Sequence, residues 1–222
     1  MEKIVIFTGP SLSPDKARKI FDKATYMPPI KRGDAVKAFE LGARLIGIID
    51  GIFFTEVAVS PRELLSLLDK GVTLVGGSSM GALRAAELDA YGMIGVGRIY
   101  EMYRSGEINS DDEVALIFTP DTLKSLSEPM VNIRHNLKAL VETNLIDSKT
   151  AEDLLEIASK LHYPLRTYER VIELAIDEKL LSKVEGDKIL HTLAQQRVDL
   201  KSLDAVKVIE KVREIAVQRN LI

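Results

Sequence analysis

The feature that most constrains the fold is a series of short apolar runs in the first half of the chain, each followed by a helical pattern. Residues 3–7, 45–49 and 72–75 are strand-length runs dominated by apolar side chains. Strands that are apolar on both faces are typical of parallel sheets that helices cover on both sides. The sequence therefore predicts an α/β fold, with a mostly parallel, Rossmann-like sheet and helices on both of its faces.

Helix signals separate these apolar runs. Ser13 and Pro14 are typical of an N-cap and a first helical position, so a helix is expected to begin at Pro14. Residues 61–70 and 80–90 carry apolar side chains at helical spacing, and each segment ends close to a glycine. Residues 112–118 are a candidate for one further strand.

The second half of the chain differs in composition. Thirteen of the 14 glycines lie at or before Gly106, which makes the first half rich in turns. Beyond residue 129, apolar residues recur at the spacing of packed helices. We expect an α/β core over residues 1–125 and an all-helical C-terminal region over residues 126–222.

Composition limits the chemistry. The formal net charge is -3, without the basic stripe that a nucleic-acid partner requires. The chain has no cysteine, so it cannot form disulfides or carry sulfur on a thiol of its own. No run reaches the ~18 apolar residues of a spanning helix, and no signal-peptide pattern precedes residues 3–7. The expectation is a cytoplasmic protein without a membrane partner.

The sharpest motif is G-x-S-x-G at residues 77–81, which follows an apolar strand and precedes a helix. In a nucleophile elbow, small residues such as Gly77 allow a tight turn that presents the serine, here Ser79, at a helix N-terminus. Free N–H groups there can stabilise an oxyanion. Two other interpretations stay open: Ser79 as an ordinary helix N-cap, and Ser79 as an anchor for a phosphate or carboxylate.

A nucleophilic serine needs a base, and the chain offers few. Its three histidines, His135, His162 and His191, all lie in the helical half. His135 is the one candidate, with a surface helical histidine as the alternative. A standard serine–histidine–acid triad is therefore not predicted, and activation by a carboxylate or a lysine remains open.

Further charged residues follow the strands and turns. Asp50 ends an apolar strand, so it is expected at the same carboxyl edge of the sheet as Ser79, although an Asp-Gly turn would look the same. Arg32 can pair with an anion, or residues 32–34 can simply begin a helix capped by Asp34 or the glycine before it. The acidic residues 111–113 suit Mg²⁺ or a cationic partner, or are solvated.

These segments together resemble the TfuA-like family. The longest match is S-M-G-A-L-R-A-x-E-L, beginning at Ser79, and the resemblance covers residues 4–137. The other matching segments are Phe7–Leu12, Pro28-Pro29 with Arg32–Asp34, Ile48–Gly51, Gly92–Gly97, Tyr103-Arg104, Asp111–Ala115 and Leu126–Arg134. Many relatives have His-Lys-Glu where this chain has residues 61–63, Pro-Arg-Glu, so a histidine base at position 61 is missing.

The resemblance implies a role beside YcaO enzymes, which use ATP to activate a peptide amide so that sulfur can replace its oxygen. Such partners are thought to release sulfide from a ThiS-like thiocarboxylated carrier protein, or to activate YcaO by binding. In methane-forming archaea the target is a glycine of methyl-coenzyme M reductase, and this branch fits the plain helical tail. No cofactor and no metal site are expected.

Two hypotheses follow for the site. In the first, the chain is a serine-type thiocarboxylate hydrolase with catalytic residues Ser79, Asp50 and Arg84, where Arg84 orients the helix or binds a carboxylate. In the second, it is an adaptor that docks on YcaO and recruits the peptide or protein substrate or the carrier. Binding residues in either case are Arg32, Asp34, Gly77, Met80, Asp112, Glu113, Glu128, Asn132 and Arg134. Glu128 and Arg134 bracket a helix start, where an exposed ion pair would contribute little.

Overall fold

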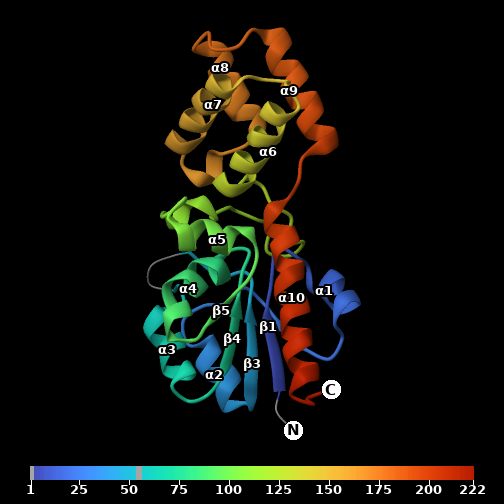
Figure 1. The fold of residues 1–222 in the computed structure, drawn as a ribbon. Coiled ribbons are helices and arrows are strands. Elements are labelled where there is room, and N and C mark those ends of the chain that lie inside the picture. Colours follow the sequence, from blue (N-terminus) through green and yellow to red (C-terminus); the bar gives the residue numbers. More distant parts are fainter. Residues whose placement is uncertain (1–2, 54–56) are drawn as a thin grey trace. The chain divides into compact units, whose positions relative to one another are not determined.

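A computed structural model describes residues 3–53 and 57–222 (Figure 1). The chain divides into two compact units. The first, called here the sheet unit, comprises residues 1–111 together with residues 201–222. The second, the helical unit, comprises residues 112–200. The sheet unit is thus built from two stretches of chain, and each unit is described by itself below.

The sheet unit contains a parallel sheet of five strands in the order β2-β1-β3-β4-β5. The strands are β1 (Lys3–Phe7), β2 (Thr25–Met27), β3 (Ala43–Ile48), β4 (Thr73–Gly76) and β5 (Ile94–Gly95). Every pairing between these five strands is parallel. The predicted α/β fold is therefore confirmed, and the strand order is that of flavodoxin-type doubly wound sheets.

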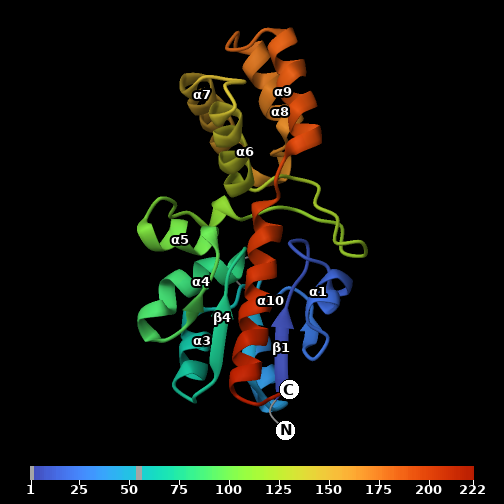
Figure 2. The ribbon, with the colours of Figure 1, turned by 45° about the vertical axis from the view of Figure 1, so that its right-hand side comes forward.

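Helices cover both faces of this sheet. One face packs against α2 (Asp34–Glu40), α3 (Pro61–Leu68) and α4 (Met80–Leu88). The other packs against α1 (Pro14–Ile20) and α10 (Leu200–Gln218), and α10 lies along the sheet in both ribbon views (Figures 1 and 2). Strand side chains alternate between the two cores, as expected for a strand buried on both sides. Val5 and Phe7 enter the first core, whereas Ile4 and Ile6 enter the second.

The turns that follow β1, β3 and β4 lie at the carboxyl edge of the sheet, as the sequence predicted. The chain runs from β1 outward to β2 and then back to β3 on the other side, so the direction of winding reverses between β1 and β3. Ligands of open α/β sheets bind in the crevice outside the strand ends at such a point. The loop at Gly9 follows β1, Asp50 follows β3 and Ser79 follows β4, so all three lie at one edge.

The helical unit is built from packed helices around its own core. These are α6 (Met130–Glu142), α7 (Ser148–Lys160), α8 (Tyr168–Asp177) and α9 (Lys183–Gln196), with a short 3-10 helix η3 (Tyr163–Leu165). Their apolar faces meet in one cluster, as the helical spacing predicts. None of the helices in the described parts of the chain is sufficiently long and apolar to cross a membrane.

Three local features differ from the expectations. Residues 112–118 form no strand within the described chain; they contain most of a 3-10 helix, η2 (Asp111–Glu113), and one isolated bridge. Strands β2 and β5 were not predicted, because three and two residues give too little alternation to detect. Residues 201–222 are helical as expected, but they belong to the sheet unit.

Between β4 and β5 lie α4 and the 3-10 helix η1 (Asp89–Tyr91), and α5 (Arg98–Ser105) follows β5. Helix α4 approaches the sheet closely because it begins with glycine. A Cβ on Gly81 would lie 1.8 Å from the Ile48 carbonyl oxygen, and one on Gly76 would lie 2.2 Å from the Gly81 oxygen. Both contacts are with backbone, which cannot move aside as a flexible side chain can.

We therefore expect Gly81→Ala to lower the free energy of unfolding by about 3 kcal/mol, the upper end of ordinary overpacking costs. Gly71→Asn is the control, because nothing lies within 4 Å of its Cβ position and asparagine tolerates its φ of +77°. Urea unfolding followed by circular dichroism measures both. Equal stability of the two variants would contradict the close approach.

Candidate functional site

The β4–α4 turn has an unusual backbone. Ser78 adopts a φ of +68°, a left-handed conformation that is uncommon for a residue other than glycine. Ser79 follows with φ -118° and ψ -120° and occupies the N-cap position of α4. In a nucleophile elbow the strain falls on the presented serine, whereas here it falls one residue earlier. The turn therefore shares the G-x-S-x-G sequence and its place between strand and helix, but not the position of the strained residue.

The Ser79 hydroxyl is not used as a helix cap. It makes no cap hydrogen bond to α4. Ser79 is nevertheless only 1% exposed. The hydroxyl is therefore not committed to the backbone N–H groups at the start of α4. This geometry disfavours the interpretation of Ser79 as an ordinary N-cap.

Neighbouring residues hold the turn tightly against β3. The Gly77 N–H donates to the Ile48 oxygen at 3.3 Å, and the Gly81 N–H donates to the Ile49 oxygen at 3.2 Å. Met80 is buried, and a Cβ on Gly51 would lie 2.8 Å from the Met80 Cβ. The segment that begins at Asp50 therefore lies directly beside the first turn of α4.

Asp50 is buried and firmly oriented. The Ser11 hydroxyl donates to its Oδ1 at 2.6 Å, and the Ser11 N–H donates to its Oδ2 at 3.1 Å. Burial raises the pKa of Asp50, while the ammonium of Lys201 and the Ser11 hydrogen bonds act to lower it. The exposed fraction of Asp50 is 2%. Asp50 is thus more than the solvent-exposed member of an Asp-Gly turn, because Ser11 fixes both oxygens from the neighbouring loop.

Lys201 on α10 is a residue that the sequence did not identify. It is 2% exposed, and its carbonyl oxygen accepts a hydrogen bond of 2.8 Å from the Ser78 hydroxyl. A recognisable signal exists in hindsight, since Lys201 continues the stripe of Ala205, Val208 and Val212 by one helical turn. A lysine on the buried stripe of a helix is exceptional unless it has a partner.

A second buried acid is Asp204, which lies on the same helix as Lys201. It accepts a hydrogen bond of 2.7 Å from the Ile99 N–H, in the first turn of α5, and pairs with Lys207 at 3.1 Å. A Cβ on Gly97 would lie 2.3 Å from its carboxyl carbon, so glycine is needed there. Asp204 therefore serves as the cap of α5 from another helix, a structural role.

Arg84 does not reach toward the turn. Its Nε donates to the Val59 oxygen at 2.9 Å, and its Nη1 pairs with Glu87 at 2.7 Å. It thus binds a carboxylate of its own helix and joins α4 to the loop before α3. The orienting role expected for Arg84 stays a prediction, and neither of these contacts involves Ser79.

The loop at residues 32–34 begins a helix. Gly33 is the N-cap of α2, and its N–H donates to both oxygens of Glu63 at 2.9 and 3.1 Å. Asp34 accepts from the Lys31 N–H at 3.2 Å, and the Arg32 N–H donates to the Val57 oxygen. The alternative of a helix start therefore holds for this loop, with Glu63 supplying the anion.

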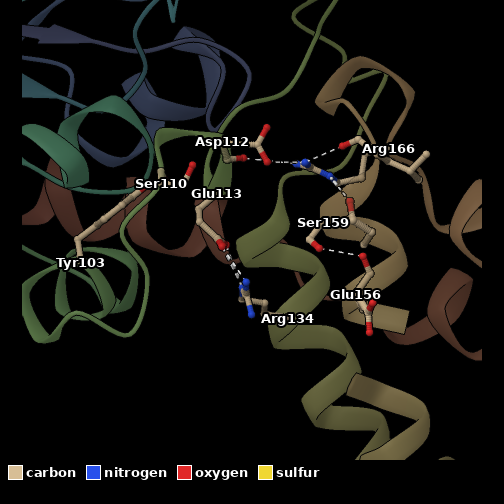
Figure 3. Close-up of polar contacts among 10 residues, drawn as sticks. Tyr103, Ser110, Asp112, Glu113, Arg134, Glu156, Ser159 and Arg166 are labelled. Carbon is tan, nitrogen blue, oxygen red and sulfur yellow. Dashed lines mark hydrogen bonds and ion pairs between the residues drawn. The ribbon is translucent and has the colours of Figure 1, made fainter. Parts of the chain in front are cut away.

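In the helical unit, two acidic residues of the predicted binding set, Asp112 and Glu113, are paired with arginines (Figure 3). Glu113 accepts from both Nε and Nη2 of Arg134, at 2.8 to 3.2 Å. Asp112 pairs with Arg166, a fully buried arginine that also donates to the Ala158 and Leu161 oxygens. Neither acid is simply solvated, and no cluster of acids and histidines suited to a metal ion occurs among the described residues.

The remaining predicted residues of this unit also have internal partners. Glu128 pairs with Arg197 at 3.1 Å. Burial is the main cause that raises the pKa of Glu128. The Asn132 amide donates to Asp199 at 3.1 Å and accepts from the Leu200 N–H at 3.0 Å. These side chains organise the start of α6.

Comparison with known proteins decides the family. The family described as TfuA-like protein matches residues 50–167, more than half of the chain. The chain belongs to the TfuA-like protein family. No curated protein sequence matches it. Membership of this family implies association with YcaO-dependent thioamidation.

The TfuA-like match divides the candidate site. Asp50 and Ser79 fall within it, whereas Ser11 and Lys201 lie outside. Ser11 and Lys201 were reached through the structure, because their contacts with Asp50 and Ser78 join distant parts of the sequence.

Arg166 offers a test of the helical unit. We expect Arg166→Met to destabilise the protein by about 2–3 kcal/mol, less than the cost of breaking a fully buried pair because Asp112 is 38% exposed. Arg170→Met is the control, since its pair with Glu173 is exposed and should matter by less than about 0.5 kcal/mol. Thermal unfolding of both variants measures the difference, and comparable losses would contradict a structural role for Arg166.

Proposed function

We propose that this protein acts with a YcaO enzyme in ATP-dependent thioamidation of a peptide backbone, and that it supplies the sulfide. The proposed sulfur donor is a carrier protein that ends in a thiocarboxylate, as in ThiS-like carriers. The observation on which this proposal rests concerns Ser79 at the N-terminus of α4. This residue is buried, and its hydroxyl does not cap the helix. Family membership supports the YcaO partner.

The proposed reaction is an acyl transfer in two steps. The Ser79 oxygen attacks the thiocarboxylate carbon, the C–S bond breaks, and the serine proton leaves with sulfur as HS⁻. Water then attacks the resulting ester, so that the carrier carboxylate, a proton and the free Ser79 hydroxyl are regenerated. Backbone N–H groups at the start of α4 are suited to stabilise the negative oxygen of each tetrahedral intermediate.

Asp50 is the proposed proton acceptor for Ser79. It lies at the same edge of the sheet, and the segment that it begins contacts the first turn of α4. A base works best when its pKa approaches the working pH, and burial moves the pKa of Asp50 in that direction. The three histidines belong to the helical unit, so a carboxylate base accounts for the site without them.

The proposed target is a backbone glycine of methyl-coenzyme M reductase, as in the archaeal branch of the family. The plain helical region beyond residue 167, which lies outside the family match, is the feature that favours this assignment. Arg32 and Asp34 in the sheet unit, and the arginine-paired acids of the helical unit, are proposed to orient the surfaces that meet the partners.

One observation favours a second function, that of an adaptor. Ser79 is only 1% exposed and Asp50 only 2%, so a carrier tail reaches them only if the edge opens. An adaptor would need no such opening, since it would dock on YcaO and recruit the carrier or the substrate through its surface. The two functions differ in whether Ser79 chemistry is required.

Replacement of the hydroxyl separates them. We expect Ser79→Ala to abolish sulfide release from a thiocarboxylated carrier while binding to YcaO persists, because one oxygen is lost from a turn that alanine tolerates. Thioamide formation with free sulfide should be spared, since the lost step precedes the YcaO reaction. The limiting rate, the half-saturating carrier concentration and the melting temperature are measured together.

The three interpretations of Ser79 give different results in this experiment. An anion anchor would raise the half-saturating carrier concentration and leave the limiting rate unchanged. A helix cap would cost about 0.5–2 kcal/mol of stability and leave thioamide formation intact. Ser13→Ala is the matched control, because Ser13 does cap α1. An unchanged limiting rate for Ser79→Ala would favour the adaptor.

The YcaO complex is itself a prediction. Because the net charge is only -3, we expect binding to rest on apolar contacts and to survive moderate salt. Co-purification of the two proteins at increasing salt concentration tests this. A complex that fails to form at every salt concentration would remove the basis for the proposed partnership.

A further inference from the structure

A groove lies between α8 and α9 of the helical unit. The two helices are joined by residues 178–182 and lie side by side in both ribbon views (Figures 1 and 2). The floor of the groove is apolar and consists of Ile172 and Ile176 from α8 and Leu190 from α9. Ile176 and Leu190 are only partly buried in the core of the unit. The helix pair therefore leaves part of its apolar surface uncovered.

The floor is fixed by a close approach of the two helices at Gly186. This glycine lies inside α9, where glycine weakens a helix unless packing requires it. A Cβ at Gly186 would lie 2.8 Å from the Ile172 Cγ2 atom and 2.8 Å from the Ile176 Cδ1 atom. The floor isoleucines therefore rest on the α9 backbone. This contact also explains why the half of the chain beyond Gly106 contains one glycine.

The rim of the groove is negatively charged. Its exposed carboxylates belong to Glu169, Glu173, Asp177 and Asp187. Lys183 also lines the groove, and Arg170 beside it pairs with Glu173 at 2.5 Å. Four carboxylates against two cations leave an excess of two negative charges. The rim therefore attracts positively charged groups and repels acidic ones.

Apolar side chains continue beyond the groove at the end of the helix pair. Val184, in the first turn of α9, is 78% exposed, and Leu180 in the preceding loop is 45% exposed. Val184 lies three positions before Asp187, so the two residues are neighbours on the surface of the helix. Apolar surface bordered by charged residues is typical of a protein interaction site.

The dimensions of the groove suit a helix of a partner protein. Its α8 side runs from Glu169 to Asp177, about 12 Å at 1.5 Å per residue. This length matches about two turns of a helix whose apolar anchors recur every three or four residues. The volume of the groove, about 260 Å³, is below the ~300–1,000 Å³ of small-molecule pockets. Side chains of a protein segment therefore fit it better than a whole small molecule.

We propose that this groove docks an amphipathic helix of a partner protein, with apolar residues on one face and lysine or arginine beside them. The apolar face covers the floor, and the cations meet the acidic rim. Charge complementarity selects this occupant, because an acidic segment is repelled by the rim. The lining residues all lie beyond residue 167, where the family match ends. The inference therefore goes beyond the proposed thioamidation and does not depend on Ser79.

Binding of a defined peptide tests the proposal. The probe is a fluorescent synthetic helix with leucines at positions i, i+3, i+4 and i+7 and lysines at the flanking positions. Fluorescence anisotropy with the full-length protein measures its dissociation constant. We expect this peptide to bind, and its affinity to fall as salt screens the rim. A peptide with the same leucines and glutamate in place of every lysine should bind at least about tenfold more weakly.

Variants of the rim distinguish the groove from a general attraction between opposite charges. Glu169→Gln, Asp177→Asn and Asp187→Asn together should weaken binding of the lysine peptide by about tenfold, since each exposed ion pair contributes modestly. A matched control removes three exposed carboxylates of α6 and α7, by Glu142→Gln, Glu152→Gln and Glu156→Gln. The control should change binding by less than about twofold, because these residues do not line the groove.

A variant of the floor tests the apolar contact. Ile176→Gln should weaken binding by about fivefold or more, because it places a polar group where the apolar face of the peptide packs. Thermal unfolding shows whether this variant folds, and Leu190→Gln takes its place if it does not. In the unchanged protein, the methyl NMR signals of Ile176 and Leu190 should shift when the lysine peptide is added.

Three results of the peptide experiments would overturn the proposal. These are the absence of binding by the lysine peptide up to about 1 mM, equal binding of the two peptides, and equal weakening in the rim variant and its control. A second copy of this chain is the competing occupant. Self-association of the unchanged protein in sedimentation, abolished by the three rim substitutions, would assign the groove to that copy and overturn the proposal as well.

Discussion

The contact between the first turn of α4 and the end of β3 governs the rest of the sheet unit. The Gly81 N–H donates to the Ile49 oxygen, and no side chain fits between the two backbones. This contact brings the residue after β3 beside the residue that begins α4. Two groups that are 29 positions apart, Asp50 and Ser79, are therefore held at one edge by backbone geometry.

Local sequence signals predicted the parts of the fold that local physics determines. The apolar runs of β1, β3 and β4, and the cap of α1 by Ser13, depend on residues close in sequence. Strands β2 and β5 owe their conformation to pairing with neighbours and carry little signal of their own. Lys201 could not be identified because Ser78, whose hydroxyl donates to its carbonyl oxygen, lies 123 residues away in the sequence.

The candidate site shows the same division. The position of Asp50 and Ser79 at one edge follows from strand order, which sequence alternation can suggest. The partners of Asp112, Glu113 and Glu128 could not be inferred, because a carboxylate in a sequence motif does not reveal which arginine it meets. These carboxylates were predicted to bind a partner, but in the structure they form ion pairs with arginines of the helical unit.

The two-part construction of the sheet unit affects how the protein is made. During translation, residues 1–111 leave the ribosome first, followed by the whole helical unit and only then by α10. Until α10 arrives, one face of the sheet, including Ile4, Ile6 and Val75, lacks the apolar cover that α10 provides. The nascent chain therefore exposes this apolar surface for the time needed to synthesise roughly 90 residues, on the order of 5–20 seconds at ordinary elongation rates. A chaperone that shields this face is expected to matter most during that interval.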